Sequence, residues 1–534
     1  MNDSNKYLLD DEAMQRFIVE GYVKLQSDLP REYHEHNWEE LEPLDETGPR
    51  GHNNLLPCVP ELRNMLEEPK VVGALTSILG PDYYLHFHRH DHVNYPDGAQ
   101  ALHKDGDGHS HYAVDGLRRY HPTRYVMLLY YPQDTPVEAG PTGIVPRSQY
   151  TTRREVDHLK HEADARRAEI YQGITKKMDA SRVRGTERFK RYEETELELN
   201  EKYPDLIASM KKASLPWEEA KIPLDGNAGT ISIVHFDTVH GRYCANVSGR
   251  QRHMVKFLFA RKEEPTGPTW NHVSPEWHGP EDDCQTPIWK YIWSWHLGAN
   301  DTNKSQQSID DLTENLDGPD DKKAISAAYE LGSTSSGLDL LFERFFSDDT
   351  DVRSIAGYGI VRAGERALPA LLSRLDDANP ELQVRIIDVI GDMGLTAASA
   401  IEPTRSLTAS ADTGVRRVAY EALGLITQQQ TKLDAGVVDA FTKGLSDEDA
   451  IVVRNATFAI SRLGAKASTD EIVDRLNGNL DHWHHHVRGW TVEALQRLDD
   501  PRAVQLALRY LTSARWDPAT KSGDRVLTSK VMRQ

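Results

Sequence analysis

Gln100-Ala-Leu-His-Lys-Asp-Gly-Asp-Gly-His-Ser-His-Tyr112 is the stretch around which the fold of this chain is predicted to be organised. His103 and Asp105 stand two positions apart in it, and positions i and i+2 of an extended strand point to the same face. One imidazole nitrogen and one carboxylate oxygen therefore converge on a single point. Gly106 and Gly108 follow at once and let the backbone turn away. The pair is the predicted start of a metal site.

A third ligand for the same ion is available from Thr238-Val-His240-Gly, which follows the strand predicted for residues 229–236. Two histidines and one carboxylate form the facial triad of non-haem Fe(II), which leaves coordination positions open for a co-substrate and O2. The alternative interpretation is that His103 and Asp105 are surface polar residues near turns, because His-x-Asp triplets occur by chance in any long chain. The surrounding sequence has to decide between the two.

A cation suited to a co-substrate follows His240. Arg252 opens the apolar run Arg252-His-Met-Val-Lys-Phe-Leu-Phe-Ala-Arg261. A buried guanidinium pairs with a carboxylate through two parallel hydrogen bonds. 2-Oxoglutarate needs such a partner, since one of its ends chelates iron and the other carries a carboxylate. Arg252 is preferred because it begins the apolar strand, and Arg250 is the competing candidate.

Other histidines compete for the metal. Four of them alternate along the strand predicted for residues 83–93 and would line one face of it: His86, His88, His90 and His92. The pair His109 and His111 has the His-x-His spacing of cupin metal sites. No glutamate follows either set at a suitable short distance. A polar strand face with substrate contacts is therefore the favoured interpretation, and a cupin-type metal site remains the alternative.

The order of these features resembles the phytanoyl-CoA dioxygenase family of Fe(II)/2-oxoglutarate oxygenases. The resemblance covers a little over half of the chain. The residues that carry it are Phe17 through Leu25, Ile78-Leu-Gly-Pro81, Gln100 with His103-Lys-Asp105, Gly140-Pro-Thr-Gly-Ile-Val-Pro-Arg-Ser-Gln149, and His240 through Arg252. It implies a double-stranded β-helix, a jelly-roll or cupin-like barrel, in a domain of residues 1–300.

The resemblance also implies a set of roles. His103, Asp105 and His240 would bind Fe(II), Arg252 would hold the far carboxylate of 2-oxoglutarate, and O2 would be used to hydroxylate a C–H bond of a small-molecule substrate, with release of succinate and CO2. Related halogenases replace the carboxylate ligand by a small residue, so Asp105 favours hydroxylation. The chain has Pro146-Arg-Ser-Gln149 where the family usually has Pro-Gly-Ser-His, which puts substrate contacts in question. The alternatives are a catalytically inactive barrel that serves as a protein-binding scaffold, and a cupin-type metalloenzyme that does not use 2-oxoglutarate.

Sequence patterns around the site predict the remaining elements of the first 300 residues. Helices are expected at 12–20 and 69–79, strands at 21–25, 83–93, 125–131, 229–236 and 252–261, and a loop-like tail at 262–300 whose tryptophans, Trp289, Trp293 and Trp295, pack back on the core. Residues 151–217 are rich in Arg, Lys and Glu and predict a helical insertion. Its basic residues fit either a salt-bridged, solvated helical face or a lid that presents positive charge to an anionic substrate.

Beyond a polar, acidic linker predicted at 301–322, the chain repeats itself through a domain of residues 323–534. Val-Arg pairs begin at 352, 384, 415, 453 and 487, and each opens an apolar helical stretch. Two helices per unit at this period predict an α-solenoid, and the units resemble HEAT repeats in which Val-Arg opens the second helix. Four glycines are expected to stop these helices: Gly364, Gly394, Gly424 and Gly464. The concave surface of such an array suits a protein partner or a second subunit.

Composition excludes several functions. A formal net charge of −20 repels nucleic acid and anionic membranes. No apolar run approaches the roughly 18 residues that span a bilayer. The first eleven residues lack the order of a signal peptide. The three cysteines, at 58, 244 and 284, are not in metal-binding spacing and predict no disulfide framework, which favours a reducing, cytoplasmic setting.

Overall fold

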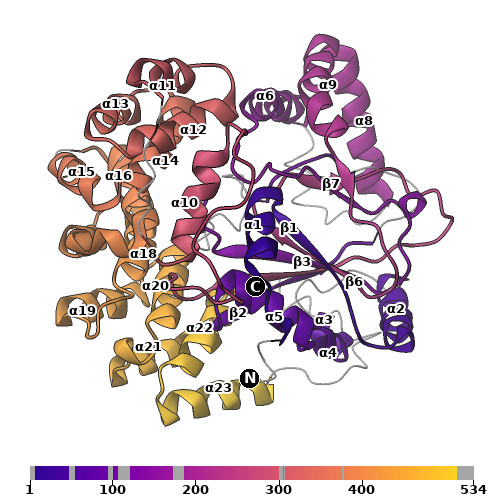
Figure 1. Ribbon diagram of the computed structural model, residues 1–534. Coiled ribbons are helices and arrows are strands. Elements are labelled where there is room, and N and C mark those ends of the chain that lie inside the picture. The colour runs from indigo at the N-terminus through magenta and orange to yellow at the C-terminus, as the bar shows by residue number, and fades with distance from the viewer. Residues whose placement is uncertain are drawn as a thin grey trace. The chain divides into compact units, whose positions relative to one another are not determined.

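The computed structural model describes residues 6–46, 55–93, 100–105, 121–171, 186–299, 305, 307–375 and 378–513. The chain forms two compact units. Residues 151–222 make one of them, and residues 1–150 together with 223–534 make the other. The larger unit holds a sheet region, up to residue 299, and a helical repeat region that follows it (Figure 1).

Two antiparallel sheets form the sheet region. The larger has the strand order β1 (Tyr22–Gln26), β6 (Thr230–His235), β3 (Tyr125–Tyr131), β8 (Val255–Arg261), β2 (Tyr83–Asp91). The smaller has the order β5 (Ile222–Pro223), β4 (Thr142–Ile144), β7 (His240–Arg242). Every residue of β3, β6 and β8 is buried, as their continuous apolar sequences predict. The predicted strands are therefore present, and β2 ends two residues before its predicted limit.

Six helices accompany the sheets within the described part of this region: α1 (Asp11–Glu20), α2 (Arg31–Glu46), α3 (Leu55–Cys58), α4 (Leu62–Leu66), α5 (Pro69–Leu79) and α10 (Thr286–His296). Helix α5 has the predicted bounds, with Pro69 in its first turn and Gly80 at its end with φ of 86°. The prediction of a loop-like tail is wrong for α10. Trp289 and Trp293, four residues apart, are buried on one face of this helix and hold it against the core.

The repeat region is a two-layer array of helices. They are α11 (Ile309–Leu316), α12 (Asp321–Gly332), α13 (Ser335–Phe345), α14 (Thr350–Ala363), α15 (Leu368–Leu375), α16 (Pro380–Met393), α17 (Ile401–Leu407), α18 (Thr413–Ile426), α19 (Ala435–Gly444), α20 (Ala450–Leu463), α21 (Asp470–Asn479), α22 (His485–Arg497) and α23 (Pro501–Ser513). The even-numbered helices from α12 to α22 pack against one another in sequence order. The segment 301–322, predicted as a linker, contains α11, whose Leu312 and Leu316 are buried.

Each Val-Arg pair lies in the first turns of an even-numbered helix, from α14 to α22, as predicted. Three of the five arginines, Arg353, Arg416 and Arg488, donate to a backbone carbonyl oxygen of the turn before their own helix. Arg416, for example, donates to the carbonyl oxygen of Ser410 at 3.1 Å and pairs with Asp447 of the next unit at 2.9 Å. Gly364 and Gly464 end their helices with positive φ, and Gly394 does the same. Gly424 does not, because α18 continues to Ile426 and Gly424 is the close contact with Ala459 of α20.

One continuous apolar core extends from the sheet region into the first repeats. Polar anchors reinforce it, and several of them use the even-numbered helix layer. Asp392 of α16 pairs with Arg124 at 3.0 Å, and the oxygens of Ser461 and Glu493 accept from Lys262 at 3.4 and 3.2 Å. Where these contacts lie, the even-numbered helix layer is covered by the chain's own sheet region.

The insertion is a bundle of three described helices, α6 (Arg154–Tyr171), α8 (Thr186–Lys202) and α9 (Pro204–Glu219), each of which packs against the other two. Arg167 of α6 pairs with Glu196 of α8 at 2.6 Å, and Arg166 pairs with Glu169 at 3.0 Å. These two arginines therefore fit the salt-bridged face that the sequence allowed. Lys176, Lys177, Arg182 and Arg184 lie outside the described residues.

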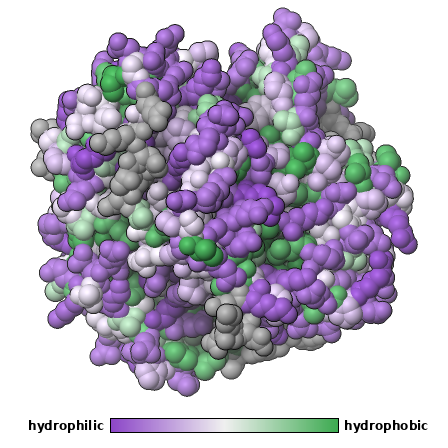
Figure 2. Space-filling model, viewed as in Figure 1, coloured by the Kyte–Doolittle hydropathy of each residue, from purple (hydrophilic) through white to green (hydrophobic). Residues whose placement is uncertain are grey.

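The surface agrees with the polar composition. On the face shown in Figure 2, hydrophilic residues predominate and hydrophobic ones are scattered among them. Within the described ranges, no helix combines the length and the apolar sequence that crossing a bilayer requires.

Candidate functional site

The two predicted histidine ligands lie side by side because their backbones pair. His103 and His240 exchange both backbone hydrogen bonds, at 2.8 and 2.9 Å, so the segment that carries His103 is joined to β7 at its first residue. Gly241 makes this close approach feasible: a Cβ there would lie 2.9 Å from the carbonyl oxygen of Ala101. Segments 137 residues apart in sequence are thereby held in a fixed register.

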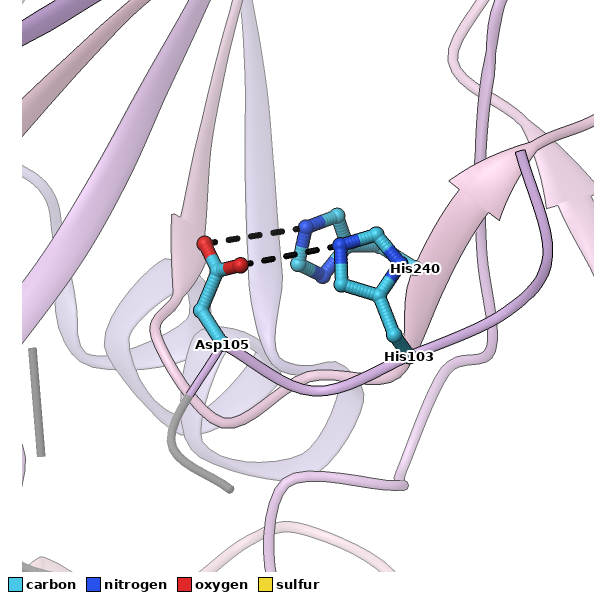
Figure 3. A group of neighbouring side chains, drawn as sticks. All are labelled: His103, Asp105 and His240. Carbon is cyan, nitrogen blue, oxygen red and sulfur yellow. Dashed lines mark ion pairs between the residues drawn. The ribbon is translucent and has the colours of Figure 1, made fainter. Parts of the chain in front are cut away.

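Asp105 completes the predicted group. Its Oδ1 lies 3.6 Å from Nε2 of His103, and its Oδ2 lies 3.8 Å from Nε2 of His240 (Figure 3). One ligand atom from each residue falls within 4.8 Å of the other two, and in the described part of the chain this is the one group of its kind. The structure thus brings together the three side chains that the sequence selected.

Backbone carbonyls orient both imidazoles. Nδ1 of His103 is 3.0 Å from the carbonyl oxygen of Ala101, and Nδ1 of His240 is 3.0 Å from that of Thr238. A carbonyl oxygen only accepts, so in each neutral ring Nδ1 carries the proton and Nε2 keeps its lone pair. Both lone pairs are on the nitrogens that face Asp105. Metal-bound histidines are typically fixed in this way by the nitrogen that does not bind the ion.

The protonation states match those of a metal site. Burial, together with the charge of His103, lowers the pKa of His240 to about 3, so this ring is neutral near pH 7. Burial would raise the pKa of Asp105, but Lys256 and His240 lower it well below the usual value of 3.8. Neutral imidazole and ionised carboxylate are the forms that bind a cation. Two nitrogen donors and one oxygen donor on one side of a point fit a non-haem Fe(II) ion.

Arg252 is a buried cation, and its charge acts on His92, as does that of Asp105. Only 5% of its surface is exposed, and it donates to the carbonyl oxygens of Gly140 at 2.9 Å and His92 at 3.3 Å. Its Nε has no hydrogen-bond partner, and it pairs with no carboxylate among the described residues. Burial lowers the pKa of Arg252. The competing candidate, Arg250, is exposed. Its carbonyl oxygen accepts a hydrogen bond from the buried amide of Asn246 at 2.7 Å, which closes the turn before β8.

The histidine ladder does not line one face of β2. The pairing of β2 with β8 shifts register between Leu85 and Arg89, and such an irregularity breaks the period of two. His86 faces the repeat region, with its ring 5.8 Å from that of His486. The rings of His90 and His92 are 4.2 Å apart at the other end of the strand.

His92 belongs to the surroundings of the candidate site. Burial and the charges of His90 and Lys256 lower its pKa well below 6.5, and Asp105 and Arg252 also act on it. The side chain of His88 and the residues His109 and His111 lie outside what the structure describes.

The loop that departs from the family pattern has a structural role. Ser148 Oγ accepts from the backbone N–H of Val239 at 2.8 Å, directly before His240, and Gln149 donates to the carbonyl oxygen of Ile18 at 2.9 Å. Arg147 pairs with Glu20 at 2.8 Å. The loop therefore ties β7 to α1.

Lys256 was missed by the sequence reasoning. It lies on β8, is 5% exposed, and donates from Nζ to Oδ2 of Asp105. One signal was present in the sequence. Lys256 is a lone charge inside an apolar run, and it stands four residues after Arg252, a spacing that places both on one face of an extended segment.

Comparison with known proteins identifies part of the chain. Residues 368–458 match the family model of HEAT repeats, which confirms the resemblance predicted for the helical units there. The curated proteins contain no match to this chain.

Solved structures resemble the chain only distantly. The non-haem α-ketoglutarate-dependent carbocyclase SnoK from nogalamycin biosynthesis is 17% identical, with 48% of this chain and 85% of that chain covered and a TM-score of 0.29. The non-haem monooxygenase ThoJ, in a nickel complex, is 13% identical over 53% and 94% of the two chains, with a TM-score of 0.29. HygX from Streptomyces hygroscopicus, with nickel and 2-oxoglutarate bound, is 14% identical over 48% and 88%, with a TM-score of 0.30.

Proposed function

We propose that the chain is an Fe(II)- and 2-oxoglutarate-dependent dioxygenase that hydroxylates a C–H bond of a small-molecule substrate and releases succinate and CO2. The observation that carries the proposal is the pairing of two features: a His-Asp-His group with both Nε2 lone pairs directed at the carboxylate, and a buried arginine that pairs with no described carboxylate. In this proposal the two antiparallel sheets make the double-stranded β-helix of the phytanoyl-CoA dioxygenase family, in a domain of residues 1–300.

The proposed metal ligands hold the ion in a fixed position. His103, Asp105 and His240 would hold the iron from one side. When bound, Fe(II) supplies open coordination positions at which a co-substrate and O2 react. The protein's own contribution is to hold the donors in place before the ion arrives. The backbone pair between His103 and His240 fixes two of them, so little ordering is left to occur on binding.

Arg252 would bind the far carboxylate of 2-oxoglutarate. Taking a charge out of water is costly unless it is paired. The carbonyls of Gly140 and His92 satisfy part of the guanidinium, but they bring no negative charge. A carboxylate of the co-substrate would supply it, in the two-pronged geometry that arginine favours. The site therefore holds a cation that gains most when a carboxylate ligand is present.

Asp105 favours hydroxylation over halogenation. A halide would need the coordination position that the carboxylate takes, and Asp105 directs its oxygens at both histidines. The insertion of residues 151–217 remains the candidate for a lid, as the sequence suggested, and the substrate is proposed only as a small molecule.

Succinate formation with Fe(II), 2-oxoglutarate and O2 tests the proposal. Slow release without substrate is expected from the wild type, and at least a hundredfold less from His103→Ala, because the ion loses one of its three protein ligands. His278→Ala is the matched control, since its side chain is 64% exposed, and it should behave as the wild type.

Other results would favour the rival functions. Turnover that needs the metal but not 2-oxoglutarate would favour the cupin-type enzyme. Absence of both metal uptake and turnover in the wild type would contradict the proposal and favour the binding scaffold.

A further inference from the structure

Lys256 brings an ammonium group to the candidate metal position. Its ammonium donates to Oδ2 of Asp105, the same oxygen that lies 3.8 Å from Nε2 of His240. Its side chain is 6% exposed, so water screens this charge poorly. Within the hydrogen-bonded ladder, Lys256 pairs with Leu129 of β3 and His90 of β2, which holds the base of the side chain in place.

An ion bound by the three ligands would share Asp105 with this ammonium. Both cations are attracted to the same carboxylate, and each repels the other over a short distance in a poorly screened site. In the absence of other ligands, Lys256 therefore works against the metal.

The summed charge of the site indicates which kind of ligand would offset the repulsion between Lys256 and the ion. Apart from Asp91, which acts on Arg252 and pairs with His253 at 2.8 Å, the charged groups are Asp105, Lys256 and Arg252, and they carry one net positive charge. A divalent ion alone would raise the net charge to three, in a region where Lys256 and Arg252 are each 5% exposed. A dianion that binds next to the ion returns the net charge to one. Burying an uncompensated charge is costly, so the ion and the dianion each make binding of the other more favourable.

We propose that Lys256 couples the binding of the metal to that of the dianionic co-substrate: the ion takes Asp105 from the ammonium, and the dianion then becomes the partner of that ammonium. This inference rests on the proposed function. By linkage, the factor by which the dianion tightens metal binding is also the factor by which the metal tightens dianion binding. Lys256 therefore acts on the metal site through Asp105, and the protein binds the metal less tightly when the co-substrate is absent.

Metal binding without turnover tests the coupling. Free Mn(II) is measured by electron paramagnetic resonance in titrations of the wild type, Lys256→Met and Lys256→Gln, with and without N-oxalylglycine, an unreactive dianionic analogue of 2-oxoglutarate. Both neutral variants should bind Mn(II) alone at least tenfold more tightly than the wild type, which corresponds to about 1.4 kcal/mol. N-oxalylglycine should tighten Mn(II) binding by a larger factor in the wild type than in either variant.

Two further variants serve as controls. Lys256→Arg keeps the charge and should keep the wild-type pattern, and Lys24→Met removes a lysine that is 42% exposed and should change nothing. The expected gain in affinity has the opposite sign to the loss that a damaged fold would cause. Lys256→Gln retains a donor for Asp105 and covers the case in which the methionine variant does not fold.

The outcomes separate this inference from the proposed function. If the wild type binds Mn(II) in a manner that His103→Ala abolishes, but the neutral variants bind it no more tightly, the role of Lys256 is wrong and the metal site stands. If the wild type binds no Mn(II) with or without N-oxalylglycine, the proposed function is wrong and the coupling fails with it.

Discussion

Replacing Arg124 by methionine should destabilise the protein more than the loss of any exposed ion pair. Arg124 precedes β3 and is 4% exposed. It donates to both carboxylate oxygens of Glu264, at 2.8 and 3.1 Å, and to Asp392 of α16 through its carboxylate at 3.0 Å and its carbonyl at 3.2 Å. Its guanidinium thus joins the start of one strand, the segment after β8 and a repeat helix.

The magnitude follows from what the substitution leaves behind. The side chains of Glu264 and Asp392 are 3% and 0% exposed, so two carboxylates would remain buried without their cation. Removing one partner of a buried pair typically costs about 3–5 kcal/mol. Total stabilities are typically about 5–15 kcal/mol, so Arg124→Met would remove a large share of the free energy of unfolding.

Urea unfolding followed by tryptophan fluorescence and by far-ultraviolet circular dichroism measures this effect. Because one core joins the sheet region to the first repeats, both signals should follow the same transition for these parts. Arg31→Met is the matched control: Arg31 makes a similar two-pronged pair with Asp134, but it is 57% exposed and should cost less than about 1 kcal/mol. A loss below about 1 kcal/mol for Arg124→Met would refute the reasoning.

The pH dependence of the free energy of unfolding is a second measure of the same ion pairs. Burial would raise the pKa of Glu264, but the charge of Arg124 and its hydrogen bonds lower it below the usual value of 4.5. A carboxyl whose pKa is lower in the folded state stabilises the fold above its unfolded pKa and loses that contribution as the pH falls through the folded pKa. The wild type should therefore lose stability on acidification more steeply than Arg124→Met, in which only Arg462 and Arg261 still lower this pKa.

Two further predictions concern Lys262 and Gly241. Burial lowers the pKa of Lys262 to about 7 despite its pair with Glu493, whereas the side chain in the unfolded chain has a pKa of about 10.4. Between these two pH values the unfolded state binds more protons than the folded state. The free energy of unfolding should therefore rise with pH in this range, by up to about 1.4 kcal/mol per pH unit. Urea unfolding at pH 7.5 and 9 should show that rise weakened in Lys262→Met but kept in Lys290→Met; equal slopes in both variants would contradict the role of Lys262. Gly241→Val should open the backbone pair at the site and weaken Mn(II) binding at least tenfold, whereas Gly267→Val, where a Cβ has nothing within 4 Å, should not.

Local signals were enough to predict much of the fold. The apolar run of β3 gave its bounds, and Pro69 and Gly80 gave those of α5, because strand burial and helix capping are read from neighbouring residues. Helices α10 and α11 were missed. Their tryptophan-rich and acidic compositions resemble loops, although Ser308 caps α11 and Leu312 and Leu316 have helical spacing.

The site was partly predictable for a different reason. His103 and Asp105 share a strand face by spacing alone, and the turn before His240 suggested the third ligand. Lys256 could not be assigned in this way, because its contact with Asp105 depends on which strand end faces the ligand segment. The ion pairs of Arg124 could not be predicted from the sequence either, because its partners lie 140 and 268 positions further along the chain.

Strand β8 connects the site to the repeats. Lys256, near its beginning, donates to Asp105 of the candidate metal site, and its other end is anchored on the repeat region: Arg462 of α20 donates to the carbonyl oxygen of Arg261 at 3.1 Å, and Lys262 pairs with Glu493 of α22. Strand β8 is hydrogen-bonded to β2 on one side and to β3 on the other. Its register is therefore fixed, because a shift by one residue would turn every side chain to the opposite face. Contacts with the repeats that fix one end of β8 therefore also support the position of Lys256 near the other end. We therefore expect the repeat region to help hold the candidate site in place.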